Sequence, residues 1–111
     1  MWWRRRVPEV VVVTRQGCHL CEDMVRVVSA AAGRVPVATR DLDRELAAGR
    51  LEPPVHERWS TLVPVLLVDG REVAHHRTDA GAVRRALRRG GAGASGRSTR
   101  RFGDLRGAPI E

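Results

Sequence analysis

The chain has 111 residues, which suffice for one domain with its own core but not for two. Its 20 basic residues are all arginine and outnumber 13 acidic ones, so the net charge is +7. Much of this excess lies in residues 1–6 and 90–111, and a single Phe, no Tyr and no nucleic-acid motif argue against a nucleic-acid partner. The apolar run 10–13 is too short for a signal-peptide core or a membrane span, so we expect a cytoplasmic protein without a membrane partner.

The first expected elements surround the only two cysteines of the chain, Cys18 and Cys21. After an N-terminal extension at 1–6, the valine run within residues 9–14 predicts a central strand covered on both faces. Beyond a turn, apolar residues recur at helical spacing up to Gly33, which predicts a helix with Cys21 on its buried face. Cys18 precedes this face and is expected at the exposed tip. The apolar positions after Cys21 are Met24, Val25, Val28, Ala31 and Ala32.

The middle of the chain predicts a second strand and a short helix. Residues 35–42 have the composition of a strand, and a strand-helix-strand unit of this length makes a parallel crossover. Asp43 can cap a helix over 44–48, which Gly49 would end. A double proline then separates it from the segment 55–59, a further candidate helix in which Trp59 is expected in the core or in a lid.

The last third of the chain predicts a hairpin and a final helix. Residues 65–68 form an apolar strand, and Asp69-Gly70 is a strong signal for a two-residue turn into an antiparallel strand at 72–76. Thr78 or Asp79 can cap the last helix. Its apolar face comprises Ala82, Val83, Ala86 and Leu87, and its opposite face comprises Arg84, Arg85, Arg88 and Arg89. From residue 90 onward the sequence is rich in glycine and arginine without apolar periodicity, so 90–111 is expected to be a flexible basic tail.

Two stretches together resemble the glutaredoxin branch of the thioredoxin superfamily. One is the C-x-x-C motif of Cys18 and Cys21 between a strand and a helix, and the other is Leu-Val-Pro-Val-Leu-Leu-Val-Asp-Gly at 62–70. The resemblance covers the expected domain at 7–89. It implies an α/β fold of the thioredoxin-like, glutaredoxin type, with three layers, a mixed four-stranded sheet and the order βαβαββα. It also implies a cis peptide bond before Pro64, although an isolated X-Pro bond is cis only about one time in twenty.

The resemblance assigns the two thiols different roles in an exchange reaction. In the family, the first cysteine attacks as the thiolate and the second resolves the mixed disulfide, which gives these roles to Cys18 and Cys21. A free cysteine has a pKa of about 8.5, and helix N-terminal amides or a nearby cation lower it. Arg15 stands where glutaredoxins often carry a basic residue, so it is a candidate for that cation; the alternative is an exposed charge at the end of a strand.

The resemblance also implies where a substrate would bind. Family members pair the backbone before the cis-proline with a peptide or glutathione, which points to Val63 and Pro64. Asp79 matches the aspartate that holds glutathione, but His75 and His76 replace the usual two glycines, so Asp79 could be only a helix cap. We expect a monomer with no bound cofactor, which exchanges with a disulfide-bearing protein or a small thiol substrate. Glutathione or a similar low-molecular-weight thiol is a candidate reductant.

Two other readings of the cysteine pair remain open from the residues alone. Zinc would need Cys18, Cys21 and two of the four histidines, but His75 and His76 are adjacent on an expected strand and would point to opposite faces. A structural disulfide across so small a loop would remove little chain entropy. We therefore expect redox chemistry and no metal ligands. The alternative function is a non-catalytic thioredoxin-fold binding module, zinc-loaded or without turnover.

Overall fold

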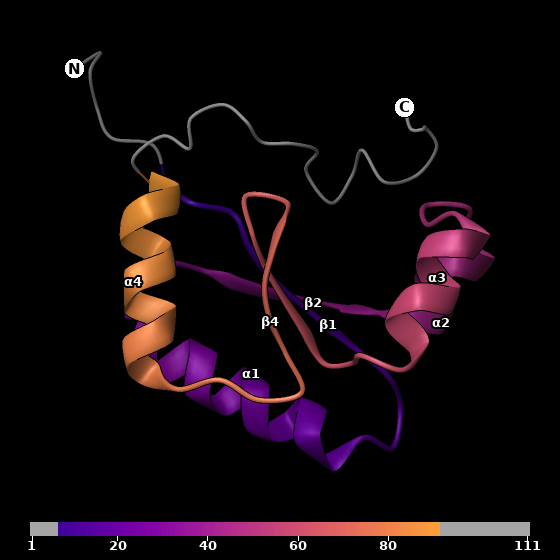
Figure 1. Ribbon diagram of the computed structural model, residues 1–111, viewed down its shortest axis with the longest axis horizontal. Coiled ribbons are helices and arrows are strands. Elements are labelled where there is room, and N and C mark those ends of the chain that lie inside the picture. The colour runs from indigo at the N-terminus through magenta and orange to yellow at the C-terminus, as the bar shows by residue number, and fades with distance from the viewer. Residues whose placement is uncertain (1–6, 92–111) are drawn as a thin grey trace.

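The computed structural model describes residues 7–91, so the expected extension at 1–6 and most of the expected tail lie outside the described residues. This part of the chain forms four strands and four helices, whose arrangement can be followed in Figure 1. In chain order they are β1 (Val10–Thr14), α1 (His19–Ala32), β2 (Val37–Asp41), α2 (Leu42–Ala47), α3 (Pro53–Ser60), β3 (Val65–Val68), β4 (Arg71–His75) and α4 (Ala80–Gly91). Within 7–91, no helix is both long and apolar enough to cross a membrane.

The four strands form one mixed sheet in the order β2-β1-β3-β4. β1 runs parallel to β2 and antiparallel to β3, and β4 pairs antiparallel with β3. The parallel pair follows from the crossover through α1, and the antiparallel pair from the short hairpin between β3 and β4. The predicted mixed four-stranded sheet is therefore confirmed.

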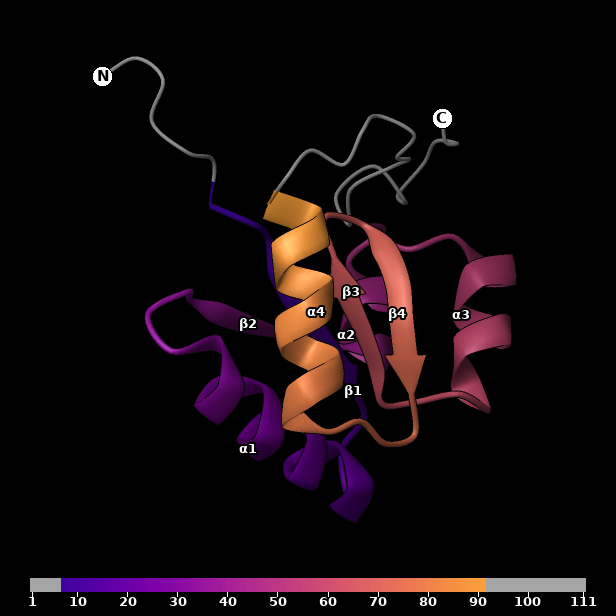
Figure 2. The same ribbon diagram turned by 60° about the vertical axis from the view of Figure 1, so that its left-hand side comes forward.

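Helices cover both faces of the sheet, which gives three layers (Figures 1 and 2). Alternate valines of β1 point to opposite faces, as the pleat of a strand requires. Val10 and Val12 pack with the residues of α1 and α4, whereas Val11 and Val13 pack on the side of α2 and α3. The unbroken valine run is thus explained by a strand buried on both faces. The thioredoxin-like α/β fold class is confirmed.

The predicted order βαβαββα has one helix between β2 and β3, and the further candidate helix at 55–59 is found as a second one, α3. Two helices, α2 and α3, join β2 to β3, so the order is βαβααββα. Pro53 and Pro54 occupy the first positions of α3, where the backbone N–H has no partner within the helix and proline costs nothing. The double proline starts this helix instead of merely breaking the chain. Its Trp59 is 2% exposed and belongs to the core, one of the two alternatives expected.

The predicted cap of α2 is wrong. The Arg44 N–H donates to Oδ1 of Asp41 at 3.0 Å, so Asp41 is the N-cap and Asp43 lies in the first turn of the helix. Asp41 qualifies because its backbone is still extended at the end of β2, as a capping residue requires. Its capping leaves the Asp43 side chain available for other partners.

The hairpin and the last helix agree with the predicted signals. Asp69 and Gly70 both have positive φ angles, of 52° and 82°, as a two-residue turn of this kind requires. β4 ends at His75, one residue before the predicted end, because His76 turns away with φ at 69°. The Ala82 N–H donates to Asp79 Oδ1 at 2.9 Å, so Asp79 caps α4. This helix extends to Gly91, beyond the expected domain boundary at 89.

Candidate functional site

The two cysteines lie where β1 passes into α1. The turn between them and β1 includes Gly17, whose φ of 76° favours glycine. Cys18 is the N-cap of α1, Cys21 lies in its first turn, and their sulfurs are joined in a disulfide with the Cα atoms 5.2 Å apart. Cys21 is 3% exposed, whereas Cys18 is half-buried. Cys18 is therefore more exposed than Cys21, as predicted, but it is not the fully exposed residue that was expected.

The start of α1 provides one backbone donor for the sulfur of Cys18 and one for its carbonyl oxygen. The Cys21 N–H donates to Cys18 Sγ at 3.1 Å, and the Glu22 N–H donates to the carbonyl oxygen of Cys18 at 3.3 Å. The sulfur thus takes the place that a serine or aspartate oxygen usually fills at a helix N-terminus. Because this end of a helix carries partial positive charge, it stabilises a negative charge on that sulfur when the pair is reduced.

The cis-proline lies at the same end of the sheet as the cysteine pair. The Val63–Pro64 peptide bond is cis, as predicted. Val65, which follows, is paired with Val13 near the end of β1, from which the chain continues to Cys18. The Val63 N–H donates to the carbonyl of Trp59 at 3.0 Å. The register of β1 and β3 therefore places the cis-proline turn at the end of the sheet where the cysteine loop begins.

His76 closes the loop between β4 and α4 onto the cis-proline segment. Its backbone N–H donates to the Pro64 carbonyl at 2.9 Å, and its Nε2 lies 2.9 Å from the Thr61 carbonyl. The φ of 69° is a conformation that glycine adopts without cost and other residues rarely adopt. His76 thus retains a glycine-like backbone but adds an imidazole beside this segment. His75, by contrast, ends β4, so the two histidines are not neighbours within a strand as expected.

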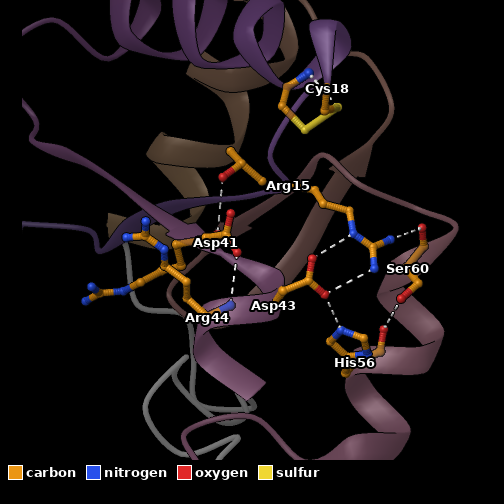
Figure 3. A network of polar contacts seen from close by, with 10 residues as sticks. Arg15, Cys18, Asp41, Asp43, Arg44, His56 and Ser60 are labelled. Carbon is orange, nitrogen blue, oxygen red and sulfur yellow. Dashed lines mark hydrogen bonds and ion pairs between the residues drawn. A yellow bond between two sulfur atoms is a disulfide. The ribbon is translucent and has the colours of Figure 1, made fainter. Parts of the chain in front are cut away.

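Arg15 is held by residues of the opposite layer. Its Nε and Nη2 donate to the two carboxylate oxygens of Asp43 at 3.0 and 3.1 Å, and Nη1 donates to the Ser60 carbonyl at 3.5 Å. Figure 3 shows the guanidinium directed toward Asp43 and Ser60 instead of toward Cys18. In this oxidised form Arg15 therefore contacts Asp43 and Ser60, and not Cys18 as suggested.

Asp43 also contacts His56, so the Arg15 ion pair belongs to a network of α2 and α3 (Figure 3). His56 Nε2 lies 2.8 Å from Asp43 Oδ1. Hydrogen bonds from Arg15 and then His56 hold the pKa of Asp43 below its usual value, and the bond to Asp43 raises the pKa of Arg15. Sequence reasoning missed this role because it used Asp43 as the cap of α2. The available signal was Asp41, an equally good capping residue two positions earlier.

A cavity of about 460 Å³ opens beside the disulfide. It lies between α1 and the ends of β1 and β2. Val63, Pro64 and Asp79 do not line it, so these three candidate residues are separate from this cavity, whereas Arg15 and both cysteines belong to it. The lining residues are Thr14, Arg15, Gln16, Gly17, Cys18, Cys21, Glu22, Val25, Arg26, Thr39 and Asp41.

The side chains considered for zinc are not brought together. Within residues 7–91, no three or more His, Cys, Asp or Glu side chains form a group that could hold a metal ion. His56 contacts Asp43, and the ring of His76 contacts the Thr61 carbonyl. The four-ligand set of two cysteines and two histidines is therefore not formed in this part of the chain.

Comparison with known proteins places the chain in a family. Three curated relatives are the uncharacterised proteins Rv0508 and MT0529 of Mycobacterium tuberculosis and Mb0520 of Mycobacterium bovis. Each is 26% identical to this chain over 72 residues, which cover 65% of the chain and 74% of the relative. The family described as "Glutaredoxin-like domain (DUF836)" matches residues 9–88, which include the cysteine pair, the cis-proline and Asp79. The chain therefore belongs to this family of glutaredoxin-like domains.

Proposed function

We propose that the protein is a thiol-disulfide oxidoreductase of the cytoplasm, in which Cys18 attacks and Cys21 resolves. The observation that carries this proposal is the unequal cysteine pair at the start of α1. Cys18 is half-buried and its sulfur accepts a backbone N–H, whereas Cys21 is 3% exposed. Thiolate character and access both govern the rate of exchange, and both favour Cys18 as the attacking thiol.

The first half of the reaction forms a mixed disulfide. The Cys18 thiolate attacks one sulfur of the substrate disulfide, a new S–S bond forms, and the second substrate sulfur leaves as a thiolate that takes up a proton. The Cys21 N–H, which lies 3.1 Å from Cys18 Sγ, stabilises the negative charge before the attack. Oxidation state is conserved in this step, since one disulfide replaces another.

The second half releases the substrate. Cys21 loses its proton and attacks Cys18 Sγ, which frees the remaining substrate thiol and leaves the Cys18–Cys21 disulfide. The substrate has gained two electrons and two protons, and the protein has lost them. The spacing supports this step, because the two Cα atoms are 5.2 Å apart, within the range that a disulfide spans. Two molecules of a low-molecular-weight thiol such as glutathione then reduce the pair and leave as their own disulfide.

The substrate of this monomer is a disulfide-bearing protein or a small thiol that contacts the cis-proline turn. Its proposed partners are Val63, Pro64 and Asp79, together with Arg15, whose guanidinium contacts the Ser60 carbonyl. Because the Val63 N–H already donates to Trp59, its carbonyl is the backbone group it offers to a substrate. Asp79 caps α4 through Oδ1, so the other carboxylate oxygen would contact the substrate.

The cysteine roles are tested by trapping. Cys21→Ser keeps the attacking thiol but removes the one that expels the product, so this variant should accumulate mixed disulfides with glutathione disulfide and with proteins in a lysate. Cys18→Ser should accumulate almost none, and the doubly substituted chain is the control for non-specific capture. Mass spectrometry identifies the modified cysteine. Trapping that required Cys21 instead of Cys18, or a wild-type pair that could not be reversibly oxidised, would contradict the mechanism.

A further inference from the structure

We propose that Asp43 is a positioning residue that draws the Arg15 guanidinium away from Cys18 and so limits the thiolate fraction of Cys18. The proposal rests on the exchange function argued above. It gives the network of Figure 3 a role in setting how oxidising the cysteine pair is, although Asp43 touches neither sulfur. Arg15 is the arginine nearest in sequence to Cys18, but its side chain is bound to Asp43 and Ser60 instead.

The contacts of the Arg15 guanidinium hold it toward Asp43 and away from Cys18. Asp43 accepts both bonds of a planar fork, the arrangement in which an arginine and a carboxylate fit best. The carboxylate is itself held from the other side by His56, whose side chain is 18% exposed. The Ser60 carbonyl, at the end of α3, accepts from the remaining nitrogen of the guanidinium. α2 and α3 thus hold a residue that belongs to the cysteine loop.

Arg15 nonetheless remains within reach of the cysteine pair. It lies three positions before Cys18 and lines the same cavity as both cysteines. Its side chain is 35% exposed and that of Asp43 is 53% exposed, so the ion pair is weak and can open. When it opens, the guanidinium can turn into the cavity beside Cys18, where a cation favours the thiolate. Asp43 would therefore set how often the Arg15 guanidinium lies beside Cys18.

The other charged groups around Cys18 lie on several elements and are not bound by Asp43. Those that line the cavity are Glu22 and Arg26 on α1 and Asp41 at the end of β2. Arg26 is paired with Asp23 on its own helix, and Asp41 caps α2. Outside the cavity, His19 follows Cys18 on the surface, and His76 contacts the Thr61 carbonyl from the β4–α4 loop. Among these groups, Arg15 is the cation whose position is decided by a residue of another layer.

The test measures Cys18 reactivity in four combinations of Arg15 and Asp43. In a Cys21→Ser background, which leaves one thiol, the rate of alkylation by iodoacetamide is followed from pH 5 to pH 9. Asp43→Asn should shift the profile to lower pH and accelerate alkylation below its midpoint by about three- to tenfold, the effect of a cation near a thiolate. In an Arg15→Gln background the same substitution should have little effect. Asp43→Ala serves as a second variant, because asparagine can still accept one bond from Arg15.

A second readout is the equilibrium of the intact cysteine pair with glutathione. Stabilising the thiolate stabilises the reduced form, so Asp43→Asn should make the pair more oxidising by a similar factor, provided that Arg15 is present. Glu57→Gln is the matched control, since it also removes an exposed acid from this layer without touching Arg15. Both readouts should be unchanged in that variant.

Each remaining outcome overturns the proposal. Equal acceleration by Asp43→Asn with and without Arg15 would mean that Asp43 acts through its own charge. No change, or slower alkylation, would mean that Arg15 does not reach Cys18 when released. Alkylation needs no turnover, so these results are independent of whether the pair exchanges disulfides, which the Cys21→Ser trapping experiment decides separately.

Discussion

Cys18 caps the N-terminus of α1 with its sulfur, at a position where serine, threonine or aspartate is usual. The same sulfur therefore caps the helix and is the proposed attacking atom. The backbone N–H that completes the cap is the same group that stabilises a thiolate, so the local structure and the reactivity of Cys18 are coupled. Sequence spacing predicted the helix and the pairing of the cysteines, but this hydrogen bond became visible only in the structure.

His76 combines a backbone conformation that favours glycine with an imidazole side chain. The backbone keeps the left-handed conformation, yet the imidazole contacts the Thr61 carbonyl beside the cis-proline segment. His76→Gly would keep this conformation without cost and remove the ring. If small thiols bind here, the KM for glutathione disulfide should fall by about tenfold, which corresponds to roughly 1.4 kcal/mol of binding.

The control for this experiment is His75→Ala, which removes the neighbouring imidazole from the end of β4. Steady-state kinetics with glutathione disulfide should give an unchanged KM for the control. A KM that stays the same or rises in His76→Gly would place small-thiol binding elsewhere, and the cavity lined by Arg15 and Asp41 would be the next place to examine.

Elements defined by local signals were predictable, and those defined by contacts across the sheet were not. The valine run of β1, the helical spacing of α1 and the Asp-Gly turn before β4 each occupy a short stretch of sequence. The start of α2 instead depends on where β2 stops pairing with β1, at Asp41 opposite Thr14. Arg15 and Asp43 are 28 positions apart, so their pairing could not be read from spacing either.

The two aspartates at the start of α2 provide a test of this assignment. Asp41→Ala removes the cap and should lower the free energy of unfolding by about 1 kcal/mol, the usual cost of such a change. Asp43→Ala removes an exposed ion pair and should leave stability nearly unchanged. Urea denaturation of the two variants measures both effects. The reverse order would restore Asp43 as the cap, and equal losses would mean that the Arg15 pair contributes to folding.

Over the whole molecule, the candidate site lies at one end of a sheet that is covered on both faces. At that end, β1 leads into the cysteine loop, β3 follows the cis-proline turn, and β4 leads into the His76 loop. The ion pair of Arg15 and Asp43 links the cysteine loop to the layer of α2 and α3, whereas α1 and α4 form the other layer (Figure 2). The proposed disulfide exchange at Cys18 would therefore involve both layers of helices.

Within the described residues 7–91, the core that supports this site ends at residue 87. The two core clusters take their members from residues 10–87, and the family match ends at 88. A chain truncated after residue 91 should therefore melt within about 2 °C of the full chain, since a loss of about 1 kcal/mol would shift a domain of this size by roughly 4–8 °C. Its Cys18–Cys21 equilibrium with glutathione should also be unchanged.

Truncation after residue 82 is the control, because it removes Val83 and Ala86 from the core and should unfold the domain. A drop of several degrees on removing only residues 92–111, measured by calorimetry, would show that this segment binds the domain and contributes to its stability.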